Sequence, residues 1–271
     1  NMPQINRSNI RDLPRPTHLN TAREYALHQN GFSKAIKSFE LASTYDDETI
    51  SEWALHIRRH YIRDDQLTDS TCILPPEEYL RTLIIPDRQT TRTGDFGEII
   101  VSDIIEHNEG YVVPRYKQFD RDDRNMSGHG VDIVAYKINS QVSPKGDDTL
   151  LLIEVKSSRK EQRVSAPLRE AKSEYRRNLT RRAMSVENIR RRASMHGDKI
   201  TANEITRFQN IDAVDFQELN GYAIVISVKD VQAHINRYNT QIKESEEEHV
   251  YVVHREQLGR LIDEIYERCT K

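Results

Sequence analysis

Hydrophobic residues follow a helical period in the first part of the chain and strand-like runs later. Within residues 21–62, Trp53, Ile57 and Tyr61 recur every four positions, which predicts helices. Residues 1–20 carry three prolines among polar residues and are typical of an extended arm. We place a soft boundary near residue 90, so that residues 1–90 form an N-terminal arm and helical region.

The pattern changes to a mixture of helices and strands after this boundary. Residues 94–106 carry an apolar stripe that includes Phe96, Ile99 and Ile104, and this stripe predicts an amphipathic helix. Three strands are expected next, at residues 111–118, 131–138 and 149–157. The first of these contains Pro114 and suits a sheet edge. The third is apolar and continuous, as in a strand covered on both faces, and it most simply forms a hairpin with the second.

The last third of the chain repeats this alternation of helix and strand. A helix is expected after Glu161, with Leu168, Tyr175 and Val186 on its apolar side. Residues 222–228 and 249–253 predict two further strands, and residues 257–269 predict a final amphipathic helix. The fold class is therefore α/β, with a mixed β-sheet flanked by helices over residues 91–271.

Composition excludes several classes of protein. The longest apolar runs are far shorter than the 18 or more residues that span a bilayer, so no membrane segment is expected. The N-terminus lacks the apolar core of a signal peptide, and two cysteines agree with a reducing compartment, so we expect a cytoplasmic protein. A formal net charge of −3 excludes a uniformly cationic coat protein for nucleic acid.

Positive charge is nevertheless concentrated in one segment. Residues 156–192 hold 13 Lys or Arg residues against four acids, a pattern that fits either a phosphate-binding surface or a solvated helix face. The candidates for contact with a DNA backbone are Arg159, Lys160, Lys172, Arg176, Arg177, Arg181 and Arg182. Residues 40–69 carry eight acids against three Arg, and they could pair with this basic segment or dock a partner.

Three ionisable residues interrupt apolar strands. Asp132 lies among valines and isoleucines, and Glu154 and Lys156 follow the apolar residues 150–153. Buried charges require partners. Side chains alternate along a strand, so Glu154 and Lys156 lie on the same face about 6 to 7 Å apart. A hairpin that brings Asp132 beside them would form a site for Mg²⁺, or for Mn²⁺ in its place.

Such a group of residues could catalyse phosphodiester hydrolysis, which requires a metal, an activated water and a cation near the phosphorus. Asp132 and Glu154 would hold the metal, with the backbone carbonyl of Val155 as a further ligand and Lys156 beside the water. Glu98, on the preceding helix, could complete the shell. The Glu-x-Lys tripeptide alone favours a simple ion pair at a strand end, and the addition of Asp132 and Glu98 reverses that preference.

Other motifs give weaker signals. His56 and His60 are four residues apart on a predicted helix, but no third metal ligand is evident in the sequence, so a zinc site there is not predicted. No phosphate-binding loop of the G-x-x-x-x-G-K-[ST] type occurs, and any ATP hydrolysis would belong to a partner.

The order of these residues resembles the PD-(D/E)xK nuclease superfamily, although Val131 stands where the name has proline. More narrowly, the segments RTGDFGE (residues 92–98) and RNMSGHGVD (residues 124–132), with His60-Tyr61 upstream, look like the HamA and AbpA family of anti-phage defence proteins. The resemblance covers residues 50–270. It implies a restriction-endonuclease-like core and a nuclease subunit that acts with a helicase partner, HamB in Hachiman systems.

We therefore interpret the chain as a Mg²⁺-dependent DNA nuclease and as the effector of a two-component defence complex. One alternative is a catalytically silent protein of the same fold that serves as a DNA-binding or interaction subunit. The other is a stand-alone restriction-type endonuclease. The choice between endonuclease and exonuclease and the oligomeric state stay open at this point.

Overall fold

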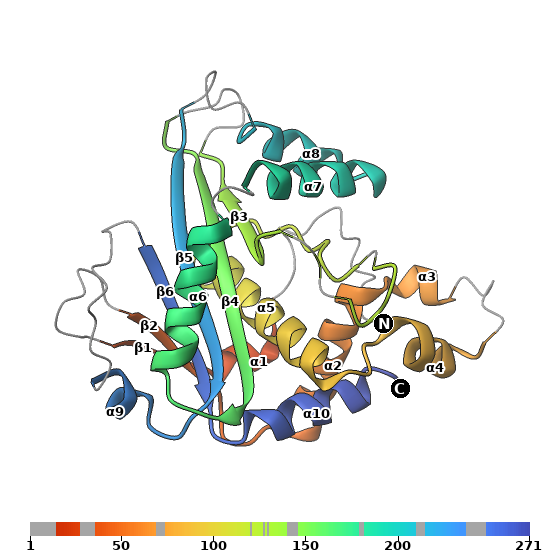
Figure 1. Cartoon of the computed structure of the whole chain (residues 1–271). Helices are drawn as coiled ribbons and strands as arrows, with labels where there is room; N and C mark the ends of the chain where they lie inside the picture. Colours follow the sequence, from red (N-terminus) through yellow and green to blue (C-terminus); the bar gives the residue numbers. More distant parts are fainter. Residues whose placement is uncertain are drawn as a thin grey trace.

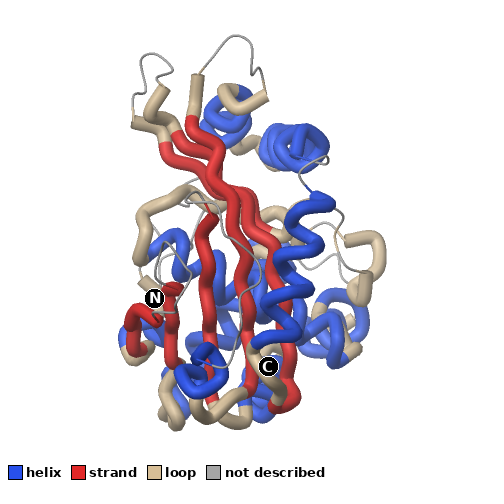
Figure 2. The backbone as a smooth tube through the Cα atoms, turned by 60° about the vertical axis from the view of Figure 1, so that its left-hand side comes forward, coloured by secondary structure: helices blue, strands red, loops and turns tan. Residues whose placement is uncertain are grey.

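The computed structural model of the chain describes residues 15–27, 36–68, 74–119, 121–126, 128, 130–139, 146–178, 182–209, 215–236 and 248–271. Within these ranges a six-stranded mixed sheet forms the centre of the molecule, and helices cover both of its faces (Figures 1 and 2). This arrangement confirms the predicted α/β class with a mixed sheet.

The sheet has the strand order β1-β2-β6-β5-β4-β3. The two strands at each edge pair antiparallel, and β2, β6, β5 and β4 run parallel to one another. The strands are β1 (Arg23–Leu27), β2 (Ile36–Glu40), β3 (Ile133–Lys137), β4 (Thr149–Glu161), β5 (Gln217–Ser227) and β6 (Glu248–Arg255). The predicted hairpin is present, because β3 and β4 pair antiparallel with Ile133 opposite Ile153.

One face of the sheet is covered by three long helices, α2 (Asp47–Tyr61), α5 (Gln89–His107) and α10 (Leu258–Arg268). The other face carries α6 (Ser165–Asn178) and, beyond it, the pair α7 (Arg182–Met195) and α8 (Lys199–Thr206), which Figure 1 shows at one end of the strands. The shorter helices are α1 (Thr17–Asn20), α3 (Asp64–Thr68), α4 (Pro76–Tyr79), the π-helix Leu80–Ile84 and α9 (Val231–Asn236).

Alternation along β4 divides its side chains between two cores. Leu151, Ile153 and Val155 belong to the core beneath α2, α5 and α10. Leu150 and Leu152 belong to the core beneath α7 and α8. Because β4 is buried on both faces over residues 149–155, its run of apolar residues was readable from the sequence.

The prediction that residues 21–62 are helical was wrong in its first half. Strands β1 and β2 lie there, and β2 pairs with β6, which is distant in the sequence. Ile36 and Phe39 of β2 enter the cores on opposite faces of the sheet. The N-terminal region and residues 91–271 therefore share one sheet, while the boundary near residue 90 stays a prediction.

Two further predictions require correction. Residues 111–118 do not form a strand, since Val112 makes only an isolated bridge with Tyr136. The single helix expected after Glu161 is two helices, α6 and α7. These helices pack on different clusters, with Leu168 of α6 over β5 and β6 and Val186 of α7 over β3 and β4. One straight helix could not reach both clusters.

No helix in the described ranges is both long enough and apolar enough to cross a bilayer.

Candidate functional site

The β3–β4 hairpin places the predicted acidic residues opposite each other. Ile133 pairs with Ile153, so Asp132, one position earlier, faces Glu154 across the hairpin. The backbone N–H of Val155 donates to Asp132 Oδ2 over 2.9 Å. Glu154 is only 4% exposed. The structure thus places the two carboxylates opposite each other at one end of the hairpin, where they could share a metal ion.

Lys156 lies two positions after Glu154 on the same face of β4, and its ammonium has two acidic neighbours. Its Nζ is 3.5 Å from Glu154 Oε1 and 2.5 Å from Glu174 Oε2 of α6. Burial disfavours the charged form of Lys156, but the hydrogen bond with Glu174 and the charge of Glu154 outweigh it and raise the pKa. Lys156 is therefore an ammonium ion at neutral pH, beside the carboxylates.

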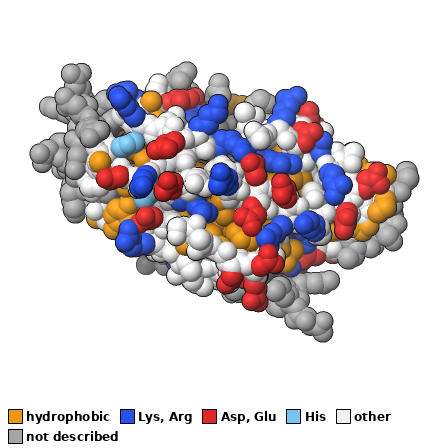
Figure 3. All heavy atoms as spheres, turned by 90° about the horizontal axis from the view of Figure 1, so that it is seen from below, with side chains coloured by type: hydrophobic (Ala, Val, Ile, Leu, Met, Phe, Trp, Pro, Cys, Tyr) orange, Lys and Arg blue, Asp and Glu red, His pale blue; other side chains and the backbone are white. Residues whose placement is uncertain are grey.

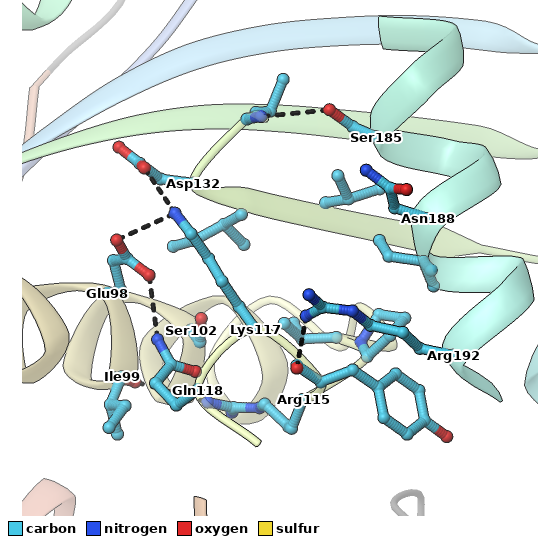
Figure 4. A pocket seen from close by; sticks show the side chains of 17 residues that line it. Glu98, Ile99, Ser102, Arg115, Lys117, Gln118, Asp132, Ser185, Asn188 and Arg192 are labelled. Atoms are coloured by element: carbon cyan, nitrogen blue, oxygen red, sulfur yellow. Dashed lines mark hydrogen bonds and ion pairs between the residues drawn. The ribbon is translucent and has the colours of Figure 1, made fainter. Parts of the chain in front are cut away.

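Glu98 reaches this site from the opposite side of the sheet through Lys117. The Lys117 ammonium donates to Glu98 Oε1 over 2.9 Å and to Asp132 Oδ1 over 2.6 Å, as Figure 4 shows. The Gln118 amide donates to the second oxygen of Glu98 over 2.9 Å. The three side chains therefore alternate in charge, and the Lys117 ammonium lies between the carboxylates of Glu98 and Asp132.

Burial and the neighbouring charges shift the pKa values of Glu98 and Asp132. Burial raises the pKa of Glu98 to about 8, against the opposing charge of Lys117. Burial also disfavours charge on Asp132, but the Lys117 ammonium and the Val155 N–H outweigh it and lower the pKa of Asp132. Asp132 is thus ionised at neutral pH, and Glu98 retains a proton more readily than an exposed glutamate does.

Helix α7 forms the far wall of a small cavity at this site. Glu98, Lys117 and Asp132 line one side of it, and Ser185, Asn188 and Arg192 of α7 line the other (Figure 4). Its volume is about 70 Å³, which suits an ion or a few waters and is well below the size of small-molecule pockets.

The turn that leads into Asp132 is fixed against α7. The Val131 N–H donates to Ser185 Oγ over 3.1 Å. Gly130 has a φ of +105°, and a Cβ there would lie 2.8 Å from Ser185 Oγ. Glycine adopts this positive φ without strain, and it has no Cβ that would collide with Ser185. The glycine before Val131-Asp132 therefore permits the close approach of α7 to the turn that positions the carboxylate.

The residues predicted to contact DNA differ in their exposure and in their ion pairs. Lys160 is exposed, whereas Arg159 pairs with Asp263 and Arg182 pairs with Glu218. Lys172 is 3% exposed, and its ammonium lies over the Tyr222 ring at 5.6 Å from the centroid. Arg181 and the side chains of Arg176 and Arg177 lie outside the described residues.

Charge of both signs is mixed on the face in Figure 3, where basic and acidic side chains alternate. A continuous basic surface is absent from the part of that face that the structure describes. The DNA-binding role of the basic residues stays a prediction.

Sequence reasoning missed Lys117, Gln118 and Glu174. Lys117 and Gln118 belong to a segment with polar character, where such side chains are ordinarily exposed. Glu174 is one acid within the basic run and resembles a surface counter-charge. Only the fold shows that these residues contact the predicted site. The catalytic roles of Asp132, Glu154, Lys156 and Glu98, and the Val155 carbonyl as a ligand, stay predictions.

Comparison with known proteins gives one family. No curated protein matches the sequence. The family model described as HamA matches residues 17–269, which is nearly the whole chain and includes the N-terminal strands as well as the site. The chain belongs to the HamA family.

Proposed function

We propose that this protein is a metal-dependent DNA nuclease that serves as the effector of a Hachiman anti-phage defence complex with a helicase partner. Membership of the HamA family is consistent with anti-phage defence. The observation that carries the nuclease proposal is the position of Asp132 opposite Glu154-Val155-Lys156, with Glu98 linked to Asp132 through Lys117.

The donors at this site fit a hard divalent cation. Four carboxylates, from Glu98, Asp132, Glu154 and Glu174, surround two ammonium groups, from Lys117 and Lys156. Burial raises the pKa of Glu98 to about 8, so at neutral pH this set carries one surplus negative charge, and it carries two when Glu98 is ionised on a bound divalent ion. Carboxylate oxygens are ligands that Mg²⁺ and Mn²⁺ prefer. Asp132, Glu154 and Glu98 would hold the ion.

Each residue then has a distinct role in hydrolysis. A bound divalent ion would neutralise phosphate oxygens and favour hydroxide formation from water. The Lys156 ammonium would orient the attacking water and stabilise charge that develops on the phosphoryl oxygens. Glu174 would hold Lys156 in place from α6. Exposed cations such as Lys160, Arg163 and Arg169 would contact the DNA backbone beyond the site without reading its sequence.

The test is DNA cleavage by the wild-type protein and by the variants Glu154→Gln and Lys156→Ala, each with and without the helicase partner. We expect Mg²⁺-dependent cleavage of plasmid or linear DNA that each variant lowers by about 10²–10³-fold. Glu161→Gln is the matched control, because Glu161 is an exposed acid at the end of the same strand.

The outcomes separate the proposal from its alternatives. Cleavage that persists in both folded variants would rule out this active site. An absence of cleavage with every partner and metal, together with phage protection that survives Glu154→Gln, would indicate a catalytically silent subunit. Strong cleavage by the protein alone would indicate a stand-alone endonuclease.

A further inference from the structure

A second cluster of metal-ligating side chains lies between α1, α2 and α5, apart from the candidate nuclease site. It contains His18 of α1, His56 and His60 of α2, and Asp103 of α5. His18 and Asp103 are fully buried, and His60 is 4% exposed. The sequence indicated His56 and His60 without a third metal ligand. In the fold, His18 and Asp103 lie beside them as further candidate ligands.

Ligand atoms of three of these residues, His56, His60 and Asp103, are close enough to share one ion, and His18 lies next to Asp103. His56 Nε2 lies 3.0 Å from Asp103 Oδ2, and His18 Nε2 lies 3.3 Å from the same oxygen. Candidate ligand atoms of His56, His60 and Asp103 all lie within 4.8 Å of one another. Tetrahedral zinc, with bonds of about 2.0–2.2 Å, separates its ligand atoms by about 3.3–3.6 Å. His56, His60 and Asp103 are therefore near this geometry, and His18, which lies next to Asp103, would move toward the other two histidines to become the fourth ligand.

Hydrogen bonds around the cluster show which ring nitrogens carry a lone pair. The Nδ1 of His60 donates to the backbone carbonyl of His56 over 2.9 Å, so its Nε2 carries the lone pair, which accepts from Arg115 Nη1 over 3.4 Å. Zinc-bound histidines commonly donate their other nitrogen in this way. His18 Nε2 pairs with Asp103 Oδ2 at 3.3 Å, while within the described residues its Nδ1 has no hydrogen-bond partner, although the ring is fully buried and stacks on Trp53 at 4.1 Å. A buried ring nitrogen without a hydrogen bond requires an explanation.

Arg115 is the main competitor for such an ion. Its guanidinium donates to Asp103 Oδ1 over 2.9 Å and to Glu106 over 2.7 Å, and it lies 3.4 Å from His60 Nε2. It therefore bonds to Asp103 Oδ1 and to His60 Nε2, while Oδ2 lies 3.3 Å from His18 Nε2, and His56 Nε2 is almost equally far from both oxygens. An outer partner on the second carboxylate oxygen is usual for a metal-bound aspartate. Arg115 can thus stay on Asp103 and Glu106 beside an occupied site, provided that it releases His60 Nε2 to the metal.

We propose that His18, His56, His60 and Asp103 form a structural Zn²⁺ site that fastens α1 and α2 to α5. Three imidazoles and one carboxylate are a typical ligand set for tetrahedral zinc. Four protein ligands leave no open position, so the site would stabilise the fold and not catalyse a reaction. Because Asp103 and Glu98 lie on the same helix, the ion would also brace the helix that presents Glu98.

The experiment measures metal in the full-length protein purified without a histidine tag. We expect about one zinc per chain by elemental analysis, and a lower melting temperature after treatment with a strong chelator. Replacement of the zinc by Co²⁺ should give the visible absorption of a tetrahedral complex. The variant His56→Gln should lose both the zinc and the cobalt spectrum, while its amide can still donate to Asp103 and keep the helices together.

His234→Ala is the matched control, because His234 lies on α9, away from the cluster, and this variant should keep the metal. Asp132→Asn should also keep it, so a failure of the nuclease proposal would not affect this result. Cobalt on the carboxylate site would have oxygen ligands and absorb only weakly. A folded wild-type protein that holds no zinc, shows no tetrahedral cobalt spectrum and ignores the chelator would overturn the proposal and leave Arg115 as the only cation of the cluster.

Discussion

Lys117 occupies the position between two carboxylates where a divalent ion would also bind. Burial disfavours its charge, but Asp132 and Glu98 outweigh this effect and raise its pKa. Removing one partner of a buried ion pair leaves an uncompensated charge and costs about 3–5 kcal/mol. We therefore expect Lys117→Met to lower the free energy of unfolding by this amount in the presence of a chelator. Addition of Mn²⁺ should recover part of the loss, since the metal can replace the ammonium.

Thermal and denaturant unfolding with chelator and with Mn²⁺ would measure both effects. Lys199→Met is the control, because Lys199 is exposed on α8 and should change the stability by less than about 0.5 kcal/mol. Equal behaviour of the two variants would mean that Lys117 is not the counter-ion of Glu98 and Asp132.

His254 makes the stability depend on pH. It is 2% exposed, and its Nε2 lies 2.7 Å from the Tyr25 hydroxyl. Burial lowers the pKa of His254 from 6.5 to about 4. The unfolded chain therefore binds a proton at a pH where the folded chain does not, and stability falls as the pH drops from about 6.5 to about 4. This one group would contribute a loss of about 3 kcal/mol across that window.

Urea unfolding between pH 7.5 and pH 4.5 would measure the loss. The variant His254→Gln keeps a side chain that can bond to Tyr25 and does not titrate, so its stability should fall less steeply with pH than that of the wild type. Parallel curves for the two proteins would contradict the assignment.

The sequence identified acids in strands more easily than it identified their partners. Asp132 and Glu154 were visible because each interrupts an apolar run, and an ionised group in such a run needs a partner. Lys117 and Glu174 lie in polar surroundings, where a charge is ordinary. Their contacts depend on how α6 and residues 111–118 fold back onto the hairpin. The sequence around Lys117 and Glu174 does not predict these contacts.

At the scale of elements, α5 can approach β4 closely because of one glycine. A Cβ on Gly97 would lie 1.7 Å from Ser157 Oγ and 3.5 Å from Val155 Cγ1. We expect Gly97→Ala to push α5 away from the sheet, cost about 1–3 kcal/mol and displace the neighbouring Glu98. Denaturant unfolding and the Mg²⁺ dependence of DNA cleavage would measure the two effects.

Gly94, on the same helix, provides the control, because a Cβ there would meet nothing within 4 Å. Gly94→Ala should therefore stabilise the protein by up to about 1 kcal/mol, as alanine does within a helix. The double variant Gly97→Ala with Ser157→Ala should recover part of the loss. A neutral Gly97→Ala would mean that the helix and the strand are not in tight contact.

Helices and strands were predictable where the apolar residues of the segment itself show which of its sides is buried. Strands β4, β5 and β6 and helices α5 and α10 were all expected from such patterns. Strands β1 and β2 were missed because each has five residues and depends on pairing with β6. The break between α6 and α7 was missed because apolar residues continue at helical spacing while the packing partner changes.

At the scale of the molecule, N-terminal and C-terminal segments share one core. Trp53 and Phe39 pack in the same cluster as Ile100, Ile153 and Tyr266. We therefore expect residues 1–90 and 91–271 to unfold together. Trp53 is the only tryptophan, so its fluorescence reports the N-terminal region, while far-ultraviolet circular dichroism reports the whole chain. The two denaturation curves should coincide, and fluorescence that changes at lower denaturant would reveal a separate N-terminal unit.

The pairing of β2 with β6 also bears on how the protein is made. Lys37 lies beside Tyr251, so the ribosome translates β2 long before it reaches the partner strand. Contacts of such high sequence separation form slowly and leave hydrophobic surface exposed in the meantime. Ile36 and Phe39 would remain exposed on the nascent chain until β6 has been translated. The last strand to be translated therefore completes the sheet, and chaperone demand should be highest just before it does.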